Sequence, residues 1–293
     1  MVRSSAEEGA VKLGRLHVNV VSDGTWRLDG GILFGQVPKA LWQRQVKADG
    51  KNRVKLGLNC VVIQSPDGVI LVEAGVGKKS DDRRKVNYGL NTGRLVSGLR
   101  EVGVKATDIN YVTFSHLHFD HAGGATKYNR KHEAVPTFPK ARYLVQESCW
   151  KDATRTNERT RAAYETSDYL PLKERDQLDL IKGDKEIATG VWLKETGGHC
   201  RGHQMVLATG GSRTIAFVGD LVPTPFHVSL PYITASDQFP EDTLERKREL
   251  LKQAEEDRWI LVFSHGLEVH AGVLERQNGR FGVKPVDLSG PDS

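Results

Sequence analysis

Short apolar runs, most of them ended by glycine or by a polar turn, recur along the chain. Runs rich in β-branched residues are typical of strands, and they occupy 16–21, 60–72, 111–114, 191–193, 205–208, 214–218 and 259–263. The run at 60–72 is interrupted by Ser65-Pro-Asp-Gly68, a turn sequence that predicts a β-hairpin. We therefore expect strands in both halves of the chain.

Three segments have the spacing or the composition of helices. Residues 92–102 and 241–257 carry apolar residues at helical spacing, the second of them after Pro240, which favours a helix start. Residues 146–164 are charged and permit a helix. Strands and helices in this order predict an α/β protein with two sheets flanked by helices, a four-layer αββα sandwich.

The length and composition are those of one large domain. With 293 residues, of which 38% are apolar, the chain can bury a substantial core. We expect a single domain over residues 1–293, with flexible tails at 1–12 and 280–293, where glycine, proline or polar residues are frequent.

Other features bear on the compartment. No apolar run approaches the ~20 residues that span a bilayer, so we expect no membrane partner. The N-terminus lacks the hydrophobic core of a secretory signal. The three cysteines, Cys60, Cys149 and Cys200, contain no CxxC pair and do not indicate a disulfide framework. The sequence therefore predicts a cytoplasmic protein.

The formal net charge of +5 raises the question of nucleic-acid binding. The basic clusters at 78–79, 83–85 and 130–131 are short and are interrupted by acidic or polar residues. No aromatic-rich basic repeat accompanies them, which favours a solvated surface. We expect no nucleic-acid partner.

The most informative segment is Ser115-His-Leu-His-Phe-Asp-His-Ala-Gly-Gly124, which follows an apolar run directly. It places four ligand-type side chains within six positions: His116, His118, Asp120 and His121. Three imidazoles and a carboxylate are costly to bury without partners, whereas a divalent cation of the zinc class uses all of them. In an extended segment the first two histidines share one face, and a turn after them brings the other two side chains toward a second cation.

Three further ligand candidates lie downstream: His199, Asp220 and His265. Each sits in a glycine-bearing loop beside a strand-like run, where a rigid scaffold can aim side chains at one point. Taken singly each is weak evidence, because a lone histidine or aspartate at a strand end is often a cap or a surface hydrogen-bonder. Their order after the HxHxDH segment is the stronger signal.

This order resembles the metallo-β-lactamase-fold hydrolase superfamily, over about residues 16–273. The set of histidines and aspartates is similar to that of its N-acyl-homoserine lactonase and glyoxalase II branches, because β-lactamases of the commonest subclass carry cysteine where this chain has Asp220. The resemblance implies the αββα metallo-β-lactamase fold. It also implies two divalent metal ions, zinc first, with iron, manganese or cobalt as alternatives.

The resemblance further implies which residues hold each ion. One ion takes His116, His118 and His199, the other takes Asp120, His121 and His265, and Asp220 bridges both. Two cations that share one water lower its pKa toward neutrality, so a bridging hydroxide is the expected nucleophile. We expect Asp120 to be catalytic as well, as a proton shuttle to the leaving alkoxide.

One residue departs from the family pattern. The usual Asp-x-Gly at a strand end is here Glu73-Ala-Gly75, and in relatives that aspartate hydrogen-bonds a metal-site histidine. Glu73 either keeps such a contact through a shifted backbone or a different ligand, or points to solvent. We also expect His203 to be a structural hydrogen-bonder, and Cys200 to point away from the metals because its neighbour His199 points toward them.

Two segments, 24–35 and 220–232, mix aromatic residues with glycine or proline, as binding loops do. The candidates for pocket lining are Trp26, Phe34, Phe226, His227 and Tyr232. For Trp26 and Phe34 the alternative is that they anchor the loop to the core. We name His227 and Tyr232 as catalytic candidates, because a histidine or tyrosine beside the metals can donate to a developing oxyanion.

Together these observations predict a dinuclear metal-dependent hydrolase of small-molecule esters or lactones, with N-acyl-homoserine lactones as the first candidate substrates. Organophosphate triesters or phosphodiesters, β-lactams and thioesters are alternatives for the same site. A non-enzymatic metal- or nucleic-acid-binding protein is the alternative of a different class. A homodimer is compatible with the sequence, which does not determine the oligomeric state.

Overall fold

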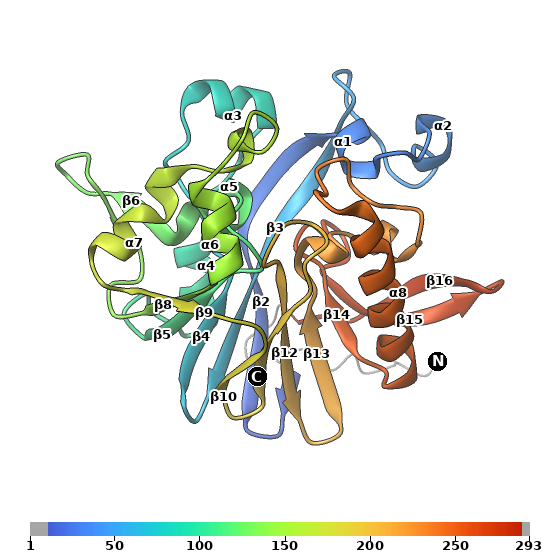
Figure 1. Cartoon of the computed structure of the whole chain (residues 1–293). Coiled ribbons are helices and arrows are strands. Elements are labelled where there is room, and N and C mark those ends of the chain that lie inside the picture. Colours follow the sequence, from blue (N-terminus) through green and yellow to red (C-terminus); the bar gives the residue numbers. More distant parts are fainter. Residues whose placement is uncertain (1–10, 289–293) are drawn as a thin grey trace.

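The computed structural model describes residues 11–288, in which two large β-sheets lie face to face (Figure 1). The first sheet has the order β1 (Val11–Leu13), β2 (Leu16–Asp29), β3 (Arg53–Ser65), β4 (Gly68–Val72), β5 (Ile109–Thr113), β8 (Arg142–Gln146) and β9 (Leu178–Ile181). The second has the order β10 (Lys185–Ala188), β11 (Val191–Glu195), β12 (Gln204–Gly210), β13 (Arg213–Phe217), β14 (Ile260–Val262), β15 (Ala271–Gln277) and β16 (Arg280–Pro285). Strands β6 (Thr126–Tyr128) and β7 (Ala134–Pro136) form a small separate pair.

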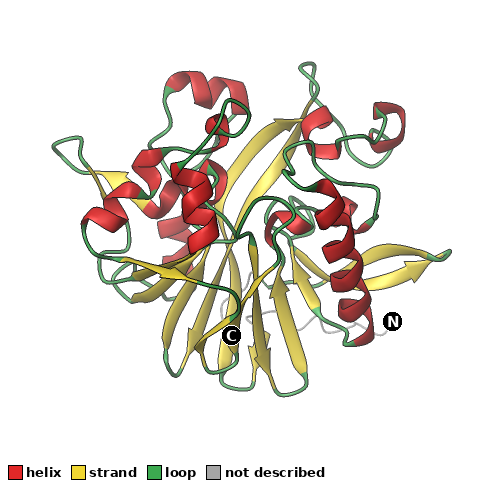
Figure 2. Cartoon of the chain, in the orientation of Figure 1, coloured by secondary structure: helices red, strands yellow, loops and turns green. Residues whose placement is uncertain are grey.

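Helices cover the outer sides of the two sheets, and further short helices lie beyond the ends of the strands (Figure 2). They are α1 (Gly30–Phe34), α2 (Lys39–Trp42), α3 (Asp82–Tyr88), α4 (Leu95–Glu101), α5 (Phe119–Ala122), α6 (Glu147–Thr154), α7 (Leu170–Glu174) and α8 (Pro240–Glu256). Short 3₁₀ turns occupy Gly123–Ala125, Arg161–Ala163, Thr166–Asp168, Gly219–Leu221 and Pro225–Val228.

Alternation of side chains along β3 separates the layers. Val61 and Ile63 belong to the apolar core between the two sheets. Cys60 and Val62 point the other way, into a second core that also contains Trp150 of α6. Because successive residues of a strand face opposite sides, one strand contributes to both cores.

Strand β13 does the same on the other sheet. Phe217 packs into the core between the sheets, while Ala216 and Val218 pack against Leu251 and Ala254 of α8. The result is helices, sheet, sheet and helix, so the predicted four-layer αββα sandwich is confirmed.

The segment predicted as a helix over 146–164 is helical only at Glu147–Thr154. In α6 the buried side chains Cys149, Trp150 and Ala153 give the helix an apolar face. Residues 155–161 contain no apolar residue, so a longer helix has nothing to bury and the chain continues as an exposed loop.

The C-terminal tail predicted from residue 280 also differs from the structure. Arg280–Pro285 forms β16, which pairs with β15 from Gly272↔Pro285 to Gln277↔Arg280. At the other end, Val11–Leu13 forms β1, paired with β2. The remaining tail positions, 1–10 and 289–293, lie outside the described residues. No helix within residues 11–288 is long and apolar enough to cross a membrane.

Candidate metal centre

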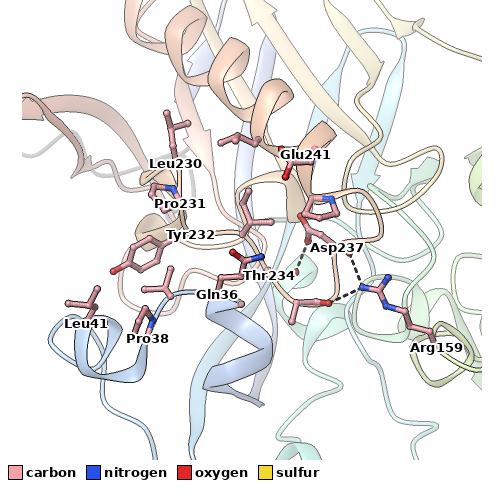
Figure 3. A pocket seen from close by; sticks show the side chains of 16 residues that line it. Gln36, Pro38, Leu41, Arg159, Leu230, Pro231, Tyr232, Thr234, Asp237 and Glu241 are labelled. Carbon is pink, nitrogen blue, oxygen red and sulfur yellow. Dashed lines mark hydrogen bonds between the residues drawn. The ribbon is translucent and has the colours of Figure 1, made fainter.

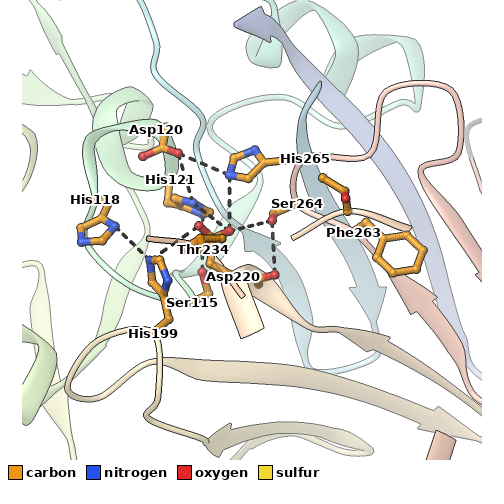
Figure 4. Close-up of polar contacts among 12 residues, drawn as sticks. Ser115, His118, Asp120, His121, His199, Asp220, Thr234, Phe263, Ser264 and His265 are labelled. Atoms are coloured by element: carbon orange, nitrogen blue, oxygen red, sulfur yellow. Dashed lines mark hydrogen bonds and ion pairs between the residues drawn. The ribbon is translucent and has the colours of Figure 1, made fainter. Parts of the chain in front are cut away.

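The seven predicted ligands come from five segments and lie close together. Figure 4 shows six of them: His118, Asp120, His121, His199, Asp220 and His265. His116 and His118 follow β5, and Asp120 and His121 lie on the short helix α5. The other three lie in the loops before β12, after β13 and after β14: His199, Asp220 and His265. Because β13 and β14 run parallel, the loops that follow them leave the sheet at the same edge.

One group of ligand atoms consists of imidazole nitrogens alone. Nε2 of His116 lies 2.7 Å from Nδ1 of His118, and Nε2 of His199 lies 3.3 Å from the same Nδ1. All three side chains are buried. Three ring nitrogens that converge on one point can bind a cation there through their lone pairs.

A second group lies beside the first. Oδ2 of Asp120 is 3.4 Å from Nε2 of His121 and 3.3 Å from Nε2 of His265. Both of these Nε2 atoms are buried and have no hydrogen-bond partner among the described residues. Unpartnered buried nitrogens beside a carboxylate have the donor chemistry that a divalent cation requires.

Asp220 lies between the two groups. Its Oδ1 is 3.4 Å from Nε2 of His121 and 3.3 Å from Nε2 of His265, while its Oδ2 is 3.6 Å from Nε2 of His199. The hydroxyl of Ser264 donates to Oδ1 at 2.9 Å and holds the carboxylate in this orientation. The donor set, histidine nitrogens and carboxylate oxygens, suits divalent ions of the zinc class.

The electrostatics of the two groups differ. Burial lowers the pKa of His118 to about 3 and that of His116 well below its usual value, so both rings are neutral. Burial also disfavours charge on His265, but the carboxylates of Asp220 and Asp120 outweigh it and raise its pKa to about 9. The two aspartates thus favour positive charge beside them, and divalent cations bound there would supply it.

Asp237 holds one of the candidate ligands from behind. Its Oδ1 accepts from Nδ1 of His199 at 2.8 Å and from the hydroxyl of Thr234 at 2.6 Å. A proton on Nδ1 leaves the Nε2 lone pair of His199 free to face the other ligands. Sequence reasoning missed Asp237, because it lies in a loop without a motif and 38 residues from its partner.

Glu73 is buried and keeps a contact with the site. Its Oε1 accepts from the backbone N–H of Ser115 at 2.8 Å, and its Oε2 lies 3.4 Å from Nδ1 of His121. The residue has a positive φ of 69°, an unusual conformation for glutamate. The solvent-facing alternative is wrong.

His203 is a structural hydrogen-bonder, as expected. Its Nε2 accepts from the backbone N–H of Asp220 at 3.0 Å, and its Nδ1 lies 2.6 Å from the hydroxyl of Thr196. Gly219 makes this approach possible: its φ is 51°, and a Cβ there would lie 2.5 Å from Cβ of Ser115 and 2.7 Å from the His203 ring.

The two other catalytic candidates, His227 and Tyr232, do not reach the ligand groups. Nε2 of His227 donates to the carbonyl of Leu33 at 2.9 Å, and its Nδ1 accepts from the hydroxyl of Thr224 at 2.7 Å. The hydroxyl of Tyr232 accepts from Gln45 at 2.9 Å. Neither side chain lines the cavity at the ligands, so the expected oxyanion role is corrected to a structural one.

A cavity of about 210 Å³ opens onto the ligand groups. Its walls include Trp26, Tyr88, Phe119 and Arg159. Trp26 therefore lines the pocket, which is one of the two roles predicted for it. Phe34 has the other role and anchors its loop: it is buried and stacks on Trp42, with 5.0 Å between ring centroids. Phe226 lines a different cavity. Sequence patterns did not mark Tyr88 or Arg159, which lie in segments without a motif.

Comparisons with known proteins agree with this geometry. The model of the metallo-beta-lactamase superfamily matches residues 54–265. An N-acyl homoserine lactonase of Bacillus cereus is 26% identical over 241 residues, which are 75% of this chain and 86% of that protein.

Two solved structures share the fold. A probable metal-dependent hydrolase from Staphylococcus aureus has a TM-score of 0.86 at 24% identity, covering 94% of this chain and 99% of that one. A dizinc quorum-quenching lactonase in complex with a product has a TM-score of 0.77 at 18% identity, covering 96% and 97%. At these identities the two structures support the fold alone. The family match over most of the chain shows more: this protein belongs to the metallo-β-lactamase superfamily and is a hydrolase of that superfamily.

Proposed function

We propose that this protein is a dinuclear metal-dependent hydrolase of lactones or related esters, with N-acyl-homoserine lactones as the first substrates to test. The observation that carries the proposal is the Asp220 carboxylate, which turns one oxygen toward each group of candidate ligands. In this proposal His116, His118 and His199 hold one ion. Asp120, His121 and His265 hold the other.

Two divalent ions held there, zinc in the first instance, supply a nucleophile at neutral pH and polarise the carbonyl that is attacked. The protein's own groups do the rest. Oδ2 of Asp120 faces His121 and His265, while its Oδ1 makes no hydrogen bond or ion pair with the described residues and belongs to a side chain that lines the cavity. In this proposal Oδ1 accepts a proton and returns it to the leaving alkoxide.

The walls of the cavity exclude water and hold the substrate. Trp26 and Phe119 form an edge-to-face pair with centroids 6.0 Å apart beside the ligand groups. A volume of about 210 Å³ accommodates a small ring at the ligands. Support for a lactone in particular comes from relatives, several of which are N-acyl homoserine lactonases at 26% identity.

The test is a substrate panel run after metal quantification. The proposal expects two metal ions per chain and turnover of N-acyl-homoserine lactones above that of S-lactoylglutathione, a chromogenic cephalosporin, paraoxon and bis-p-nitrophenyl phosphate. Preferred turnover of a phosphoester or a thioester would replace the lactone, and absence of metal would overturn the dinuclear site.

The variant Asp120→Asn tests the proton role separately. Because positioned acid–base groups typically contribute roughly 10²–10⁴-fold, kcat should fall at least tenfold while zinc content is retained. Asp242→Asn, an exposed aspartate on α8, is the control and should keep full turnover. Full metal content together with a loss of less than tenfold would contradict the proton role.

A further inference from the structure

The cavity at the candidate metal centre meets a larger one. The first has a volume of about 210 Å³ and the second about 720 Å³. Arg159 and Thr234 line both cavities, and Figure 3 shows them at the larger one. Asp237, which holds His199, lines the larger one. A ligand bound at the metals can therefore extend past Arg159 into the second cavity, whose size falls in the usual range for small-molecule sites.

The walls of the larger cavity are mainly apolar. They include Val37, Leu41, Leu230, Ile233 and Leu244. Leu41 is 48% exposed there, and Ile32, on the wall of the smaller cavity, is 42% exposed. An apolar ligand that covers these side chains removes their apolar surface from water, and this burial favours binding.

Arg159 is fixed where the two cavities meet. Its Nη2 donates to the backbone carbonyls of Ala235 at 3.3 Å and of Asp237 at 3.1 Å. Nε and Nη1 make no hydrogen bond with residues 11–288, so they remain as donors for a ligand. Among residues 155–161, Arg159 is the one that lines either cavity.

We infer that Arg159 determines substrate specificity by donating to a carbonyl oxygen that lies between the hydrolysed ring and an apolar chain in the larger cavity. This inference rests on the proposed function and narrows its substrate class to N-acyl lactones with a long straight chain. A simple lactone fills only the smaller cavity. It offers nothing to Arg159 and nothing to the apolar walls beyond it.

The experiment compares kcat/KM of the zinc-loaded protein for γ-butyrolactone and for N-butanoyl-, N-octanoyl- and N-dodecanoyl-homoserine lactone. We expect kcat/KM to rise with chain length, by up to about fourfold for each methylene that becomes buried. Arg159→Met should lower kcat/KM for the N-acyl lactones by roughly tenfold or more, because it removes a charged donor. It should affect γ-butyrolactone, which has no amide, far less.

Two further variants sharpen the result. Arg155→Met changes an exposed arginine of the same segment that lines neither cavity, and its kinetics should match those of the wild type. Leu244→Trp narrows the larger cavity and should lower kcat/KM for the dodecanoyl lactone while sparing the butanoyl one. Equal losses on γ-butyrolactone and on the N-acyl lactones in Arg159→Met, or no dependence on chain length in the wild type, would overturn the inference.

A binding measurement separates this inference from the proposed function. If the zinc-loaded protein hydrolyses no lactone, the proposed function fails. Calorimetric titration with the ring-opened N-dodecanoyl- and N-butanoyl-homoserines then decides the inference alone. Tighter binding of the dodecanoyl compound, weakened in Arg159→Met, supports it, and equal binding of the two compounds contradicts it.

Discussion

Asp237 contacts one of the candidate ligands, His199, through a short buried hydrogen bond. It accepts from His199 at 2.8 Å and from Thr234 at 2.6 Å, and it is buried with them. A carboxylate behind a ligating histidine fixes the ring and raises its basicity. Replacing Asp237 should therefore change metal affinity more than it changes the stability of the fold.

We expect Asp237→Asn to weaken zinc binding by roughly 10–100-fold, because the amide keeps the shape of the side chain but loses its charge. Competition with a chromogenic chelator measures this affinity. Asp242→Asn, an exposed change nearby in sequence, should leave it unaltered. Unchanged affinity in Asp237→Asn would show that His199 is oriented without the carboxylate, or that it is not a ligand.

Single residues also show where sequence reasoning stops. The side chains of the HxHxDH segment were predictable because four ligand types stand within six positions. His227 was misread because its partners, the Leu33 carbonyl and the Thr224 hydroxyl, became visible only when the chain was folded. Leu33 is 194 residues away, and no local pattern marks it as an acceptor.

Between elements, Lys247 joins α8 to the loop that walls the larger cavity. Its ammonium group is buried and donates to the carbonyls of Ser229 at 2.8 Å, Leu230 at 3.3 Å and Tyr232 at 2.7 Å. Burial lowers its pKa to about 7, although Asp237 acts in the opposite direction. The helix thus holds the loop with a cation that titrates far below the usual lysine range.

This contact predicts a pH-dependent stability. The unfolded lysine has a pKa of about 10.4, so between about pH 7 and pH 10 the unfolded chain binds the proton more tightly than the folded one. The free energy of unfolding, relative to that of Lys247→Met, should therefore rise with pH across this window, by at most about 1.4 kcal/mol per pH unit. Below pH 7 the difference should be constant.

Urea unfolding at pH 6, 7.5 and 9 measures this difference. Lys252→Met is the control, because Lys252 lies on the same helix with its side chain 74% exposed, and it should give no such pH dependence. A difference between wild type and Lys247→Met that does not change with pH would mean that Lys247 remains charged in the folded protein throughout the range.

The helix α6 shows what apolar spacing can and cannot predict for an element. Its buried face is visible in the sequence at Cys149, Trp150 and Ala153. The predicted continuation through 155–161 relied on charged residues, which are compatible with a helix but provide no apolar face to stabilise one by packing. Instead the segment carries Arg159 to the cavities, a role that depends on tertiary contacts with Ala235 and Asp237.

At the scale of the molecule, the layers were predictable and the pairing within them was not. Alternating apolar runs indicated two sheets with helices outside. The strand order could not be read from these runs, because β5 pairs with β8 and β13 with β14 across long insertions. Strand β16 was missed because Arg280–Pro285 includes glycine, proline and two charged residues and has no fully buried side chain. Its backbone pairing with β15, which no local pattern reveals, orders the segment.

One apolar core lies between the two sheets and two others lie between the sheets and their helices, so the fold should persist without metal while its stability falls. The described ligand groups bury two aspartates and five histidines at one edge, where metal neutralises the carboxylates and pairs the ring nitrogens. A ligand that binds only the folded state stabilises it by about 2.7 kcal/mol at 100 times its Kd. For a domain of this size, that should raise Tm by roughly 5 °C or more.

Thermal unfolding with excess zinc and with excess chelator measures the shift, and far-UV circular dichroism at 25 °C should be the same in both. His265→Ala should show a smaller zinc-dependent shift, because it removes a candidate ligand that lies 3.3 Å from both carboxylates. His270→Gln, outside the ligand groups, should keep the full shift. Equal Tm values for the wild type in zinc and in chelator would mean that this edge of the sandwich holds its charges without a metal.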